Sequence, residues 1–148
     1  MKPTNTQRQK NDRGAALIEM ALTLPLLLLL SVAVFEFGRA FQTWQVLTNA
    51  TREGARVAVL PGTSDGAVST RVTDYLEAGQ LPSASFASIL IARDVAISIG
   101  GTDTSASTVT VDYPFEFMVL QPIARLVVPG SDVGEAITMS VSATMRNE

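Results

Sequence analysis

The sequence predicts an α+β fold in which a long N-terminal helix crosses a membrane and then packs on a small three-stranded antiparallel sheet. Three observations lead to this prediction. An apolar run over residues 15–35 contains a single ionisable side chain, apolar and small residues then recur every three or four positions to about residue 60, and the period changes to two beyond residue 88. Periods of 3.6 and 2 distinguish helix from strand. The chain is therefore expected to be a single-pass membrane protein.

Residues 15–35 have the length and composition of a transmembrane helix. At ~1.5 Å per residue, this segment would be about 31 Å long as one helix. That length matches the ~30 Å hydrocarbon thickness of a bilayer. A helix that is apolar on every side has no face suited to water. Pro25 lies inside the segment, and membrane helices tolerate proline.

The residues before this segment form a basic leader. Residues 1–14 hold four Lys or Arg and one Asp, net +3, and the remainder holds seven positive and thirteen negative groups, net −6. Positive residues beside a span stay on the cytoplasmic side, so we expect residues 1–14 inside and residues 36–148 outside. The leader lacks apolar periodicity, which predicts disorder over residues 1–13. The acidic outer part has the wrong charge for nucleic-acid binding.

Two other interpretations of the N-terminal region remain open. The leader could be a plain cytoplasmic tail that stays attached to the span. Alternatively, the segment could be a secretory signal peptide, because Ser31-Val32-Ala33 has the small-x-small form of a cleavage site. Against a signal peptide, the apolar run is long, contains a glutamate and continues as a helical pattern.

Glu19 is the ionisable residue of the apolar run. A carboxylate at this place marks a functional position, unless it lies near enough to the interface to stay hydrated. The basic leader, Gly14 and a glutamate five residues later together resemble the class III signal of type IV-like prepilins. The resemblance implies that a membrane-embedded prepilin peptidase cuts between Gly14 and Ala15. It also implies that Glu19 attracts the new amine of a neighbouring subunit, which here would be on Ala15.

Two further motifs extend the resemblance. Residues 36–41 read EFGRAF and residues 47–56 read LTNATREGAR. With the signal, they resemble the TadE family of minor pseudopilins, which belongs to the Tad (Flp) pilus system. The resemblance implies a pilin-like outline, a place in the bacterial inner (cytoplasmic) membrane or in a pilus, and partners among the peptidase, the Tad platform proteins and other pilins. Met20 stands where Flp-type signals usually carry an aromatic residue.

The helical pattern continues beyond the membrane segment and ends at Pro61-Gly62. Glu53 and Arg56 are spaced to pair on the helix surface. One stripe of apolar and small residues runs along this part, and it could pack on the protein's own sheet, which we favour, or contact neighbouring subunits. Its members are Phe37, Phe41, Trp44, Thr48, Thr51, Ala55 and Val59.

The rest of the chain predicts a short helix and a small sheet. The helix covers residues 66–79, and a second short helix should begin near Pro122. Alternating patterns predict strands over 89–99, 107–113 and 136–144, the first two joined by a turn at residues 100–103. The isoleucines of 89–99 should form one face. Because a single sheet can bury its apolar face only against helices, we expect the outer half of the long helix to cover it.

The composition argues against catalysis. The chain contains no histidine and no cysteine, which removes the commonest acid–base group and the commonest soft metal ligands. We therefore expect no enzyme activity, no cofactor, no metal and no small-molecule substrate, and membrane lipid and other proteins as partners. The favoured function is a structural minor pseudopilin in assembly, priming or tip formation of a Tad pilus. The alternative is a permanently membrane-anchored envelope protein whose outer domain binds another polypeptide.

Overall fold

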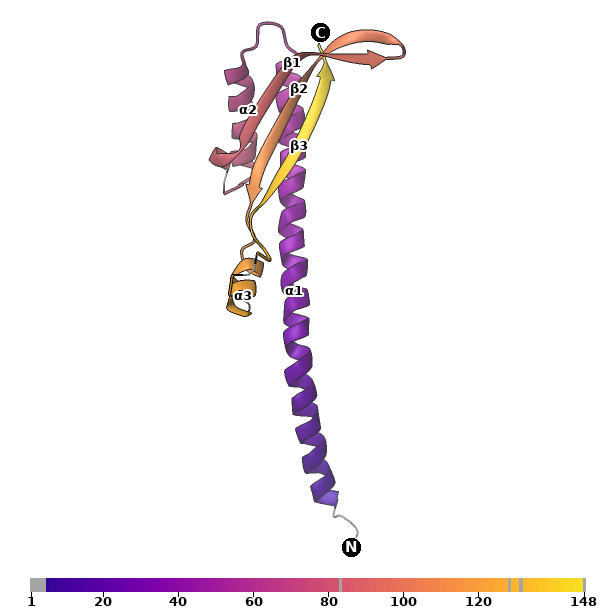
Figure 1. Ribbon diagram of the computed structural model, residues 1–148, viewed down its shortest axis with the longest axis vertical. Helices are drawn as coiled ribbons and strands as arrows, with labels where there is room; N and C mark the ends of the chain where they lie inside the picture. The colour runs from indigo at the N-terminus through magenta and orange to yellow at the C-terminus, as the bar shows by residue number, and fades with distance from the viewer. Residues whose placement is uncertain (1–4, 83, 128, 131, 148) are drawn as a thin grey trace.

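The computed structural model describes residues 5–82, 84–127, 129–130 and 132–147, and Figure 1 shows a long helix that carries a small sheet at its outer end. This arrangement confirms the predicted α+β fold. The elements, in chain order, are α1 (Asn5–Ala58), α2 (Asp65–Ala78), the 3-10 turn η1 (Ala84–Phe86), β1 (Ser88–Ile99), β2 (Thr102–Phe115), α3 (Leu120–Val127) and β3 (Ile137–Arg146).

Helix α1 is a single helix of 54 residues that contains Pro25. It includes residues 5–13, so the prediction of a disordered leader is wrong for these residues, and residues 1–4 lie outside the described chain. The physical reason is cooperativity. Once a long apolar segment is helical, each added residue gains a hydrogen bond without a new nucleation cost, and neither proline nor glycine interrupts residues 5–13.

The sheet has the strand order β1-β2-β3, with both pairs antiparallel. Strands β1 and β2 are joined by a tight hairpin in which Ile99 pairs with Thr102. Gly100 and Gly101 have φ values of 61° and 84°, which suits a two-residue turn that follows the right-handed twist of the strands. The predicted four-residue turn was therefore two residues too long.

A β-bulge in β1 changes which side chains face the core. The register shifts between Ala92 and Val95, and Asp94 has a φ of 56°. An extra residue in one strand moves all later side chains to the other face. Ile89 and Ile91 pack against the core. Val95 and Ile97 pair with Ala106 and Thr104 and lie on the opposite face, so the predicted single isoleucine face is wrong beyond Ile91.

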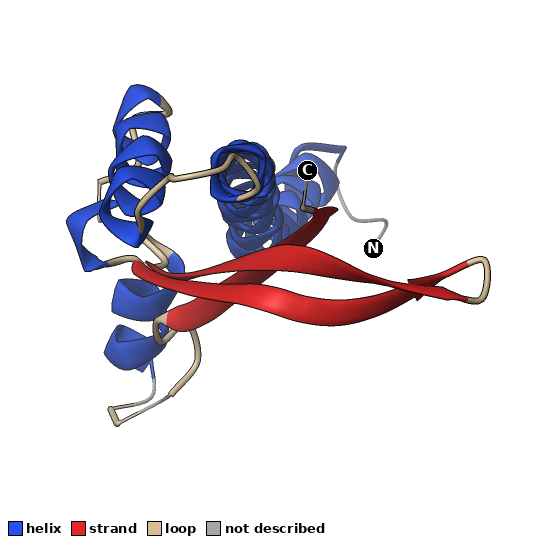
Figure 2. Ribbon diagram, turned by 90° about the horizontal axis from the view of Figure 1, so that it is seen from above, coloured by secondary structure: helices blue, strands red, loops and turns tan. Residues whose placement is uncertain are grey.

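The core lies between the sheet and two helices, and Figure 2 shows α1 and α2 on the same side of the sheet. The prediction that the outer half of α1 covers the sheet is confirmed. Among the fully buried side chains of this layer are Leu47 and Ala50 of α1, Val68, Val72 and Leu76 of α2, and Val109 and Val111 of β2. On the opposite face, β2 and β3 carry hydroxyl pairs such as Thr108–Thr144 at 2.8 Å.

The face of α1 that covers the sheet differs from the predicted stripe. Phe37, Phe41 and Trp44 are 74%, 65% and 45% exposed, so the inner half of the stripe does not pack on the sheet. The buried face instead carries small residues at its centre. A Cβ at Gly54 would come within 2.5 Å of Val72 Cγ2 and 3.4 Å of Val109 Cγ1. This close approach leaves no room for large aromatic side chains.

Glycine-to-alanine substitutions at Gly54 and Gly38 should have opposite effects on stability. Gly54→Ala forces a methyl group against Val72, and overpacking of this kind costs about 1–3 kcal/mol. Gly38 lies in the same helix with no atom within 4 Å of its missing Cβ, so Gly38→Ala should stabilise by up to about 1 kcal/mol through helix propensity. Thermal unfolding of both variants in detergent micelles measures the difference. Equal melting temperatures would contradict the close packing at Gly54.

Candidate functional site

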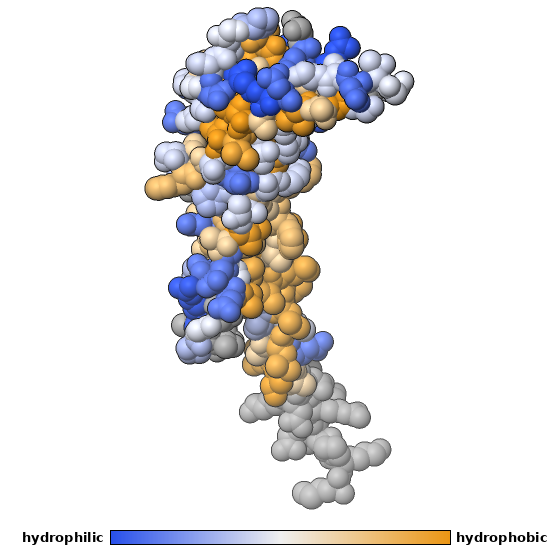
Figure 3. Space-filling model, turned by 45° about the horizontal axis from the view of Figure 1, so that its top comes forward, coloured by the Kyte–Doolittle hydropathy of each residue, from blue (hydrophilic) through white to orange (hydrophobic). Residues whose placement is uncertain are grey.

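The inner part of α1, which we call the stem (residues 14–35), carries an apolar surface with little protein cover. Every side chain from residue 14 to residue 31 is exposed, among them Leu17, Leu22 and Leu26. Figure 3 shows this surface as a nearly continuous apolar column below the outer domain. α1 is the one helix of the described chain that is long and apolar enough to cross a membrane. Such a surface requires lipid or other apolar helices as its environment.

Gly14, Ala15 and Glu19 lie together at the inner end of the stem. Gly14 is inside the helix, and nothing lies within 4 Å of its missing Cβ. Glu19 is exposed, its backbone oxygen accepts a 2.9 Å hydrogen bond from Thr23, and none of the side chains that the structure describes forms an ion pair with it. The three residues are therefore accessible from outside the fold. Their roles in cleavage and assembly stay predictions.

At the outer end of the stem, Glu36 joins α1 to α3. Glu36 is only 1% exposed. Oε1 accepts hydrogen bonds from the backbone N–H groups of Val119 at 2.6 Å and Leu120 at 3.4 Å. The first N–H groups of a helix lack partners within the helix, and a negative charge there is favourable. Glu36 therefore caps α3 from 83 residues away in the sequence.

Arg39 completes this junction, which we call the Glu36 clasp (Glu36, Arg39 and the backbone of Val119 and Leu120). Its Nη1 donates to Glu36 Oε2 at 2.9 Å and to the Glu116 carbonyl at 3.5 Å. The guanidinium also lies 5.3 Å from the centre of the Phe115 ring, within the range of a cation–π contact. A buried carboxylate is thus paired and hydrogen-bonded on both oxygens, as its burial requires.

The sequence motif at residues 36–41 contains the Glu36–Arg39 pair, but sequence reasoning gave the pair no role. The spacing of three indicates an ion pair on one helix face. The capped helix begins far along the chain, so its contact with Glu36 had no local signal. The structure explains this motif as a junction: Glu36 is buried, whereas Phe37 and Phe41 point away from the outer domain's core.

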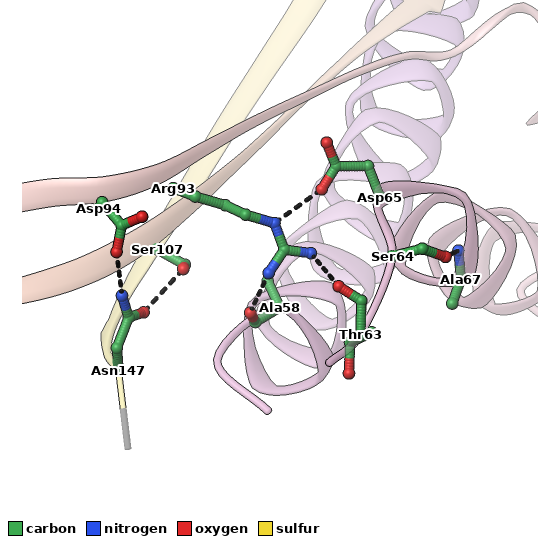
Figure 4. A network of polar contacts seen from close by, with 9 residues as sticks. All are labelled: Ala58, Thr63, Ser64, Asp65, Ala67, Arg93, Asp94, Ser107 and Asn147. Carbon is green, nitrogen blue, oxygen red and sulfur yellow. Dashed lines mark hydrogen bonds and ion pairs between the residues drawn. The ribbon is translucent and has the colours of Figure 1, made fainter. Parts of the chain in front are cut away.

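At the far end of the outer domain, Arg93 ties the bulge of β1 to the ends of two helices (Figure 4). Its Nε donates to Asp65 Oδ1 at 2.7 Å, and its two terminal nitrogens donate to the carbonyls of Ala58 and Thr63 at 2.8 Å. The neighbouring Asp94 accepts from Asn147 Nδ2 at 3.2 Å. Because the guanidinium already has three partners inside the fold, we interpret this network as structural.

Glu53 links α1 to α2 through Arg71. Arg71 Nη2 lies 2.8 Å from Glu53 Oε1, and the predicted partner Arg56 is confirmed at 3.7 Å. The hydrogen bond from Arg71 holds the pKa of Glu53 below its usual value, against the opposing effect of desolvation. A lowered pKa stabilises the folded state above the carboxyl's ordinary pKa, and this contribution is lost as the pH falls through the lowered value. The Glu53–Arg71 pair therefore links α1 to α2 in addition to their apolar packing in the core.

Neutralising Glu36 should loosen α3 without loosening the core. Glu36→Gln removes the ion pair with Arg39 and weakens both caps, and hydrogen bonds to charged groups contribute about 1.5–3 kcal/mol. We expect faster amide hydrogen exchange at Val119 and Leu120, measured by mass spectrometry in micelles, and unchanged exchange in β2. Glu53→Gln is the matched control, because it removes a carboxylate from the same helix but leaves the clasp. Unchanged exchange at Leu120 in Glu36→Gln would show that the clasp does not hold α3.

Comparison with known proteins bears on the same helix. No curated protein matches the chain, and no solved structure matches it. A scan of protein families, however, matches residues 14–56 to the family described as TadE-like protein. The matched range begins at Gly14, includes the Glu36 clasp and ends two residues before the end of α1. Residues 14–56 are therefore similar to this family, which is the one that the motifs around Glu19, Glu36 and Glu53 resemble.

Proposed function

We propose that this protein is a minor pseudopilin that takes part in assembly, priming or tip formation of a Tad pilus. The family match associates the chain with the Tad pilus system. The minor-pseudopilin role is supported by how exposed and buried side chains are distributed along the matched segment. Its first half exposes apolar side chains around the whole helix, and its second half buries one face in the outer domain. One rigid element thus joins a membrane-embedded surface to a folded domain.

This arrangement suits a subunit that passes from a membrane into an assembly. In the bilayer, lipid would cover the exposed leucines of the stem. In a filament, the apolar stems of other subunits could cover the same side chains at little cost in hydration. Because α1 is continuous from the stem to Ala58, the position of the stem fixes the position of the outer domain. The partners in this proposal are the prepilin peptidase, the Tad platform proteins and other pilins.

The proposed placement is the bacterial inner membrane, with the N-terminus in the cytoplasm. The basic charge of the first 14 residues supports this orientation. The role is structural rather than catalytic, supported by the absence of histidine and cysteine from the sequence. The second candidate is a permanently anchored envelope protein whose outer domain binds a polypeptide. The exposed aromatic side chains of Phe37, Phe41 and Trp44 would suit such binding as well. The position of the mature N-terminus therefore has to distinguish the processed pseudopilin from the anchored protein.

Processing at Gly14 distinguishes the two candidates. Intact-mass measurement of the protein from cells that contain the peptidase should show a chain that starts at Ala15. Gly14→Val should block this processing, because a side chain would obstruct close approach of the backbone to the peptidase. Gly38 resembles Gly14 in having no atom within 4 Å of its missing Cβ. Gly38→Val is therefore a matched control and should be processed normally. A wild-type chain that starts at Met1 would support the permanently anchored protein instead. A chain that starts at Val34 would indicate secretion.

Glu19 should matter for assembly but not for membrane insertion. A charged carboxylate in hydrocarbon must find a cation or lose its charge, and the amine of Ala15 in a neighbouring subunit is the proposed cation. Glu19→Gln should fractionate with membranes as the wild type does and should co-purify less with the major pilin. Thr23→Val, one turn along the stem, is the control and should co-purify normally. If Glu19→Gln retains full co-purification, Glu19 is only a hydrated residue at the interface.

A further inference from the structure

We propose that α3 and its flanking residues form a membrane-contacting element that seats the outer domain on the outer leaflet. The element consists of residues 116–127 and 132–137, and its partner is the lipid surface. This inference rests on the proposed membrane-spanning role of the stem. It adds a second point of lipid contact, one that the TadE-like match over residues 14–56 does not include.

The position of α3 is the first argument. Figure 1 shows α3 below the sheet and beside α1, on the side of the outer domain that faces the stem. The Glu36 clasp holds the start of α3 one residue beyond the predicted span of 15–35. Val32 and Ala33 are half-buried, whereas all side chains from residue 14 to residue 31 are exposed. A bilayer that surrounds the stem up to Phe35 must therefore meet α3.

The exposed apolar side chains of this element are the second argument. Met118 is 63% exposed, Val133 58%, Ile137 45% and Ile123 37%. In β3, Val141 is buried in the core, whereas Ile137 is the first residue of the strand and stays exposed. Figure 1 shows that β3 begins at its lower end, on the side of α3. Large apolar side chains that gather at one end of a domain indicate a binding surface. Here that end is the one from which a membrane-spanning helix leaves.

Polar groups of the element set its depth. Arg125 and Glu135 lie 3.8 Å apart and both are more than half exposed. Figure 3 shows a hydrophilic patch beside the apolar stem at this level. Exposed charges are excluded from the hydrocarbon centre but are compatible with headgroups, where amphipathic helices lie in the plane of the interface. We therefore place α3 at the headgroup boundary rather than deeper.

The membrane-contacting element is also held in a fixed position relative to α1 and the sheet. Gly134 packs directly on the start of α3, because a Cβ there would come within 2.7 Å of the Gln121 nitrogen. At the other end of the element, Phe117 packs edge-on against Phe115 of β2 at 5.2 Å between ring centres. With the Glu36 clasp, these contacts join α3 to both α1 and the sheet. Contact with lipid would then set how far the outer domain stands above the membrane.

Depth-dependent fluorescence quenching tests this placement in the full chain. Trp44 is the only tryptophan, so Trp44→Phe gives a background into which single tryptophans are placed by Met118→Trp or Ile123→Trp. Leu30→Trp in the stem and Leu60→Trp beyond the outer end of α1 are the controls. Each protein is reconstituted in phosphatidylethanolamine–phosphatidylglycerol vesicles with lipids brominated either near the headgroup or near the chain centre.

We expect Met118→Trp and Ile123→Trp to lose fluorescence with the shallow bromines and to lose less with the deep ones. Leu30→Trp should be quenched strongly and Leu60→Trp should not be quenched. If both α3 variants resemble Leu60→Trp while Leu30→Trp is quenched, the stem spans the bilayer but α3 does not touch it. A blue-shifted but unquenched Met118→Trp would show cover by protein, such as a second copy, and would also overturn the inference. Loss of quenching in Leu30→Trp itself would overturn membrane insertion of the stem.

Discussion

One continuous helix must satisfy two different environments, and this constraint shapes the whole molecule. From residue 14 to residue 31 α1 presents apolar side chains in every direction, whereas from Glu36 to Ala58 one face is buried in protein. The outer half can approach the sheet and α2 closely because small residues, with Gly54 at the centre, line its buried face. Burial of this face and of the apolar faces of β2 and α2 supplies the main stabilisation of the outer domain. The same backbone then carries that domain rigidly on the stem.

The Glu36 clasp lies at the border between these environments. A buried ion pair is costly to desolvate and stabilises only when its hydrogen-bonding capacity is used. Here both carboxylate oxygens are used, one by Arg39 and the other by the backbone of α3. The clasp is therefore better understood as a device that fixes position than as a source of stability. It holds α3 beside the end of the stem, which is where the lipid boundary is proposed to lie.

Much of the fold could be predicted from the sequence because its signals are local. The apolar run over 15–35 and the alternation in β1 to β3 are each formed by neighbouring residues in the sequence. The wrong predictions concern features that depend on tertiary packing. A stripe of large side chains on α1 looks like a core face, but a close helix–sheet contact selects small residues, and Phe37, Phe41 and Trp44 remain outside.

The bulge and the clasp show a second limit of sequence reasoning. An insertion of one residue at Arg93–Asp94 moves Val95 and Ile97 to the other face of the sheet, yet the isoleucine pattern continues through it. The three partners of Arg93 are Ala58, Thr63 and Asp65, and they identify the bulge only once the fold is known. For the candidate site, Gly14 and Glu19 could be found from a motif. The contact of Glu36 with α3 could not, because nothing near Leu120 in the sequence indicates an acidic cap.

The central claim is that the outer half of α1 is part of the folded core and not merely a connection to the membrane. The most direct measurement compares two fragments, residues 36–148 and residues 62–148, by circular dichroism and analytical ultracentrifugation. The account predicts that the longer fragment folds cooperatively and that the shorter one, which lacks the cover over Val109 and Val111, unfolds or aggregates. A soluble, cooperatively folded 62–148 fragment would contradict the account.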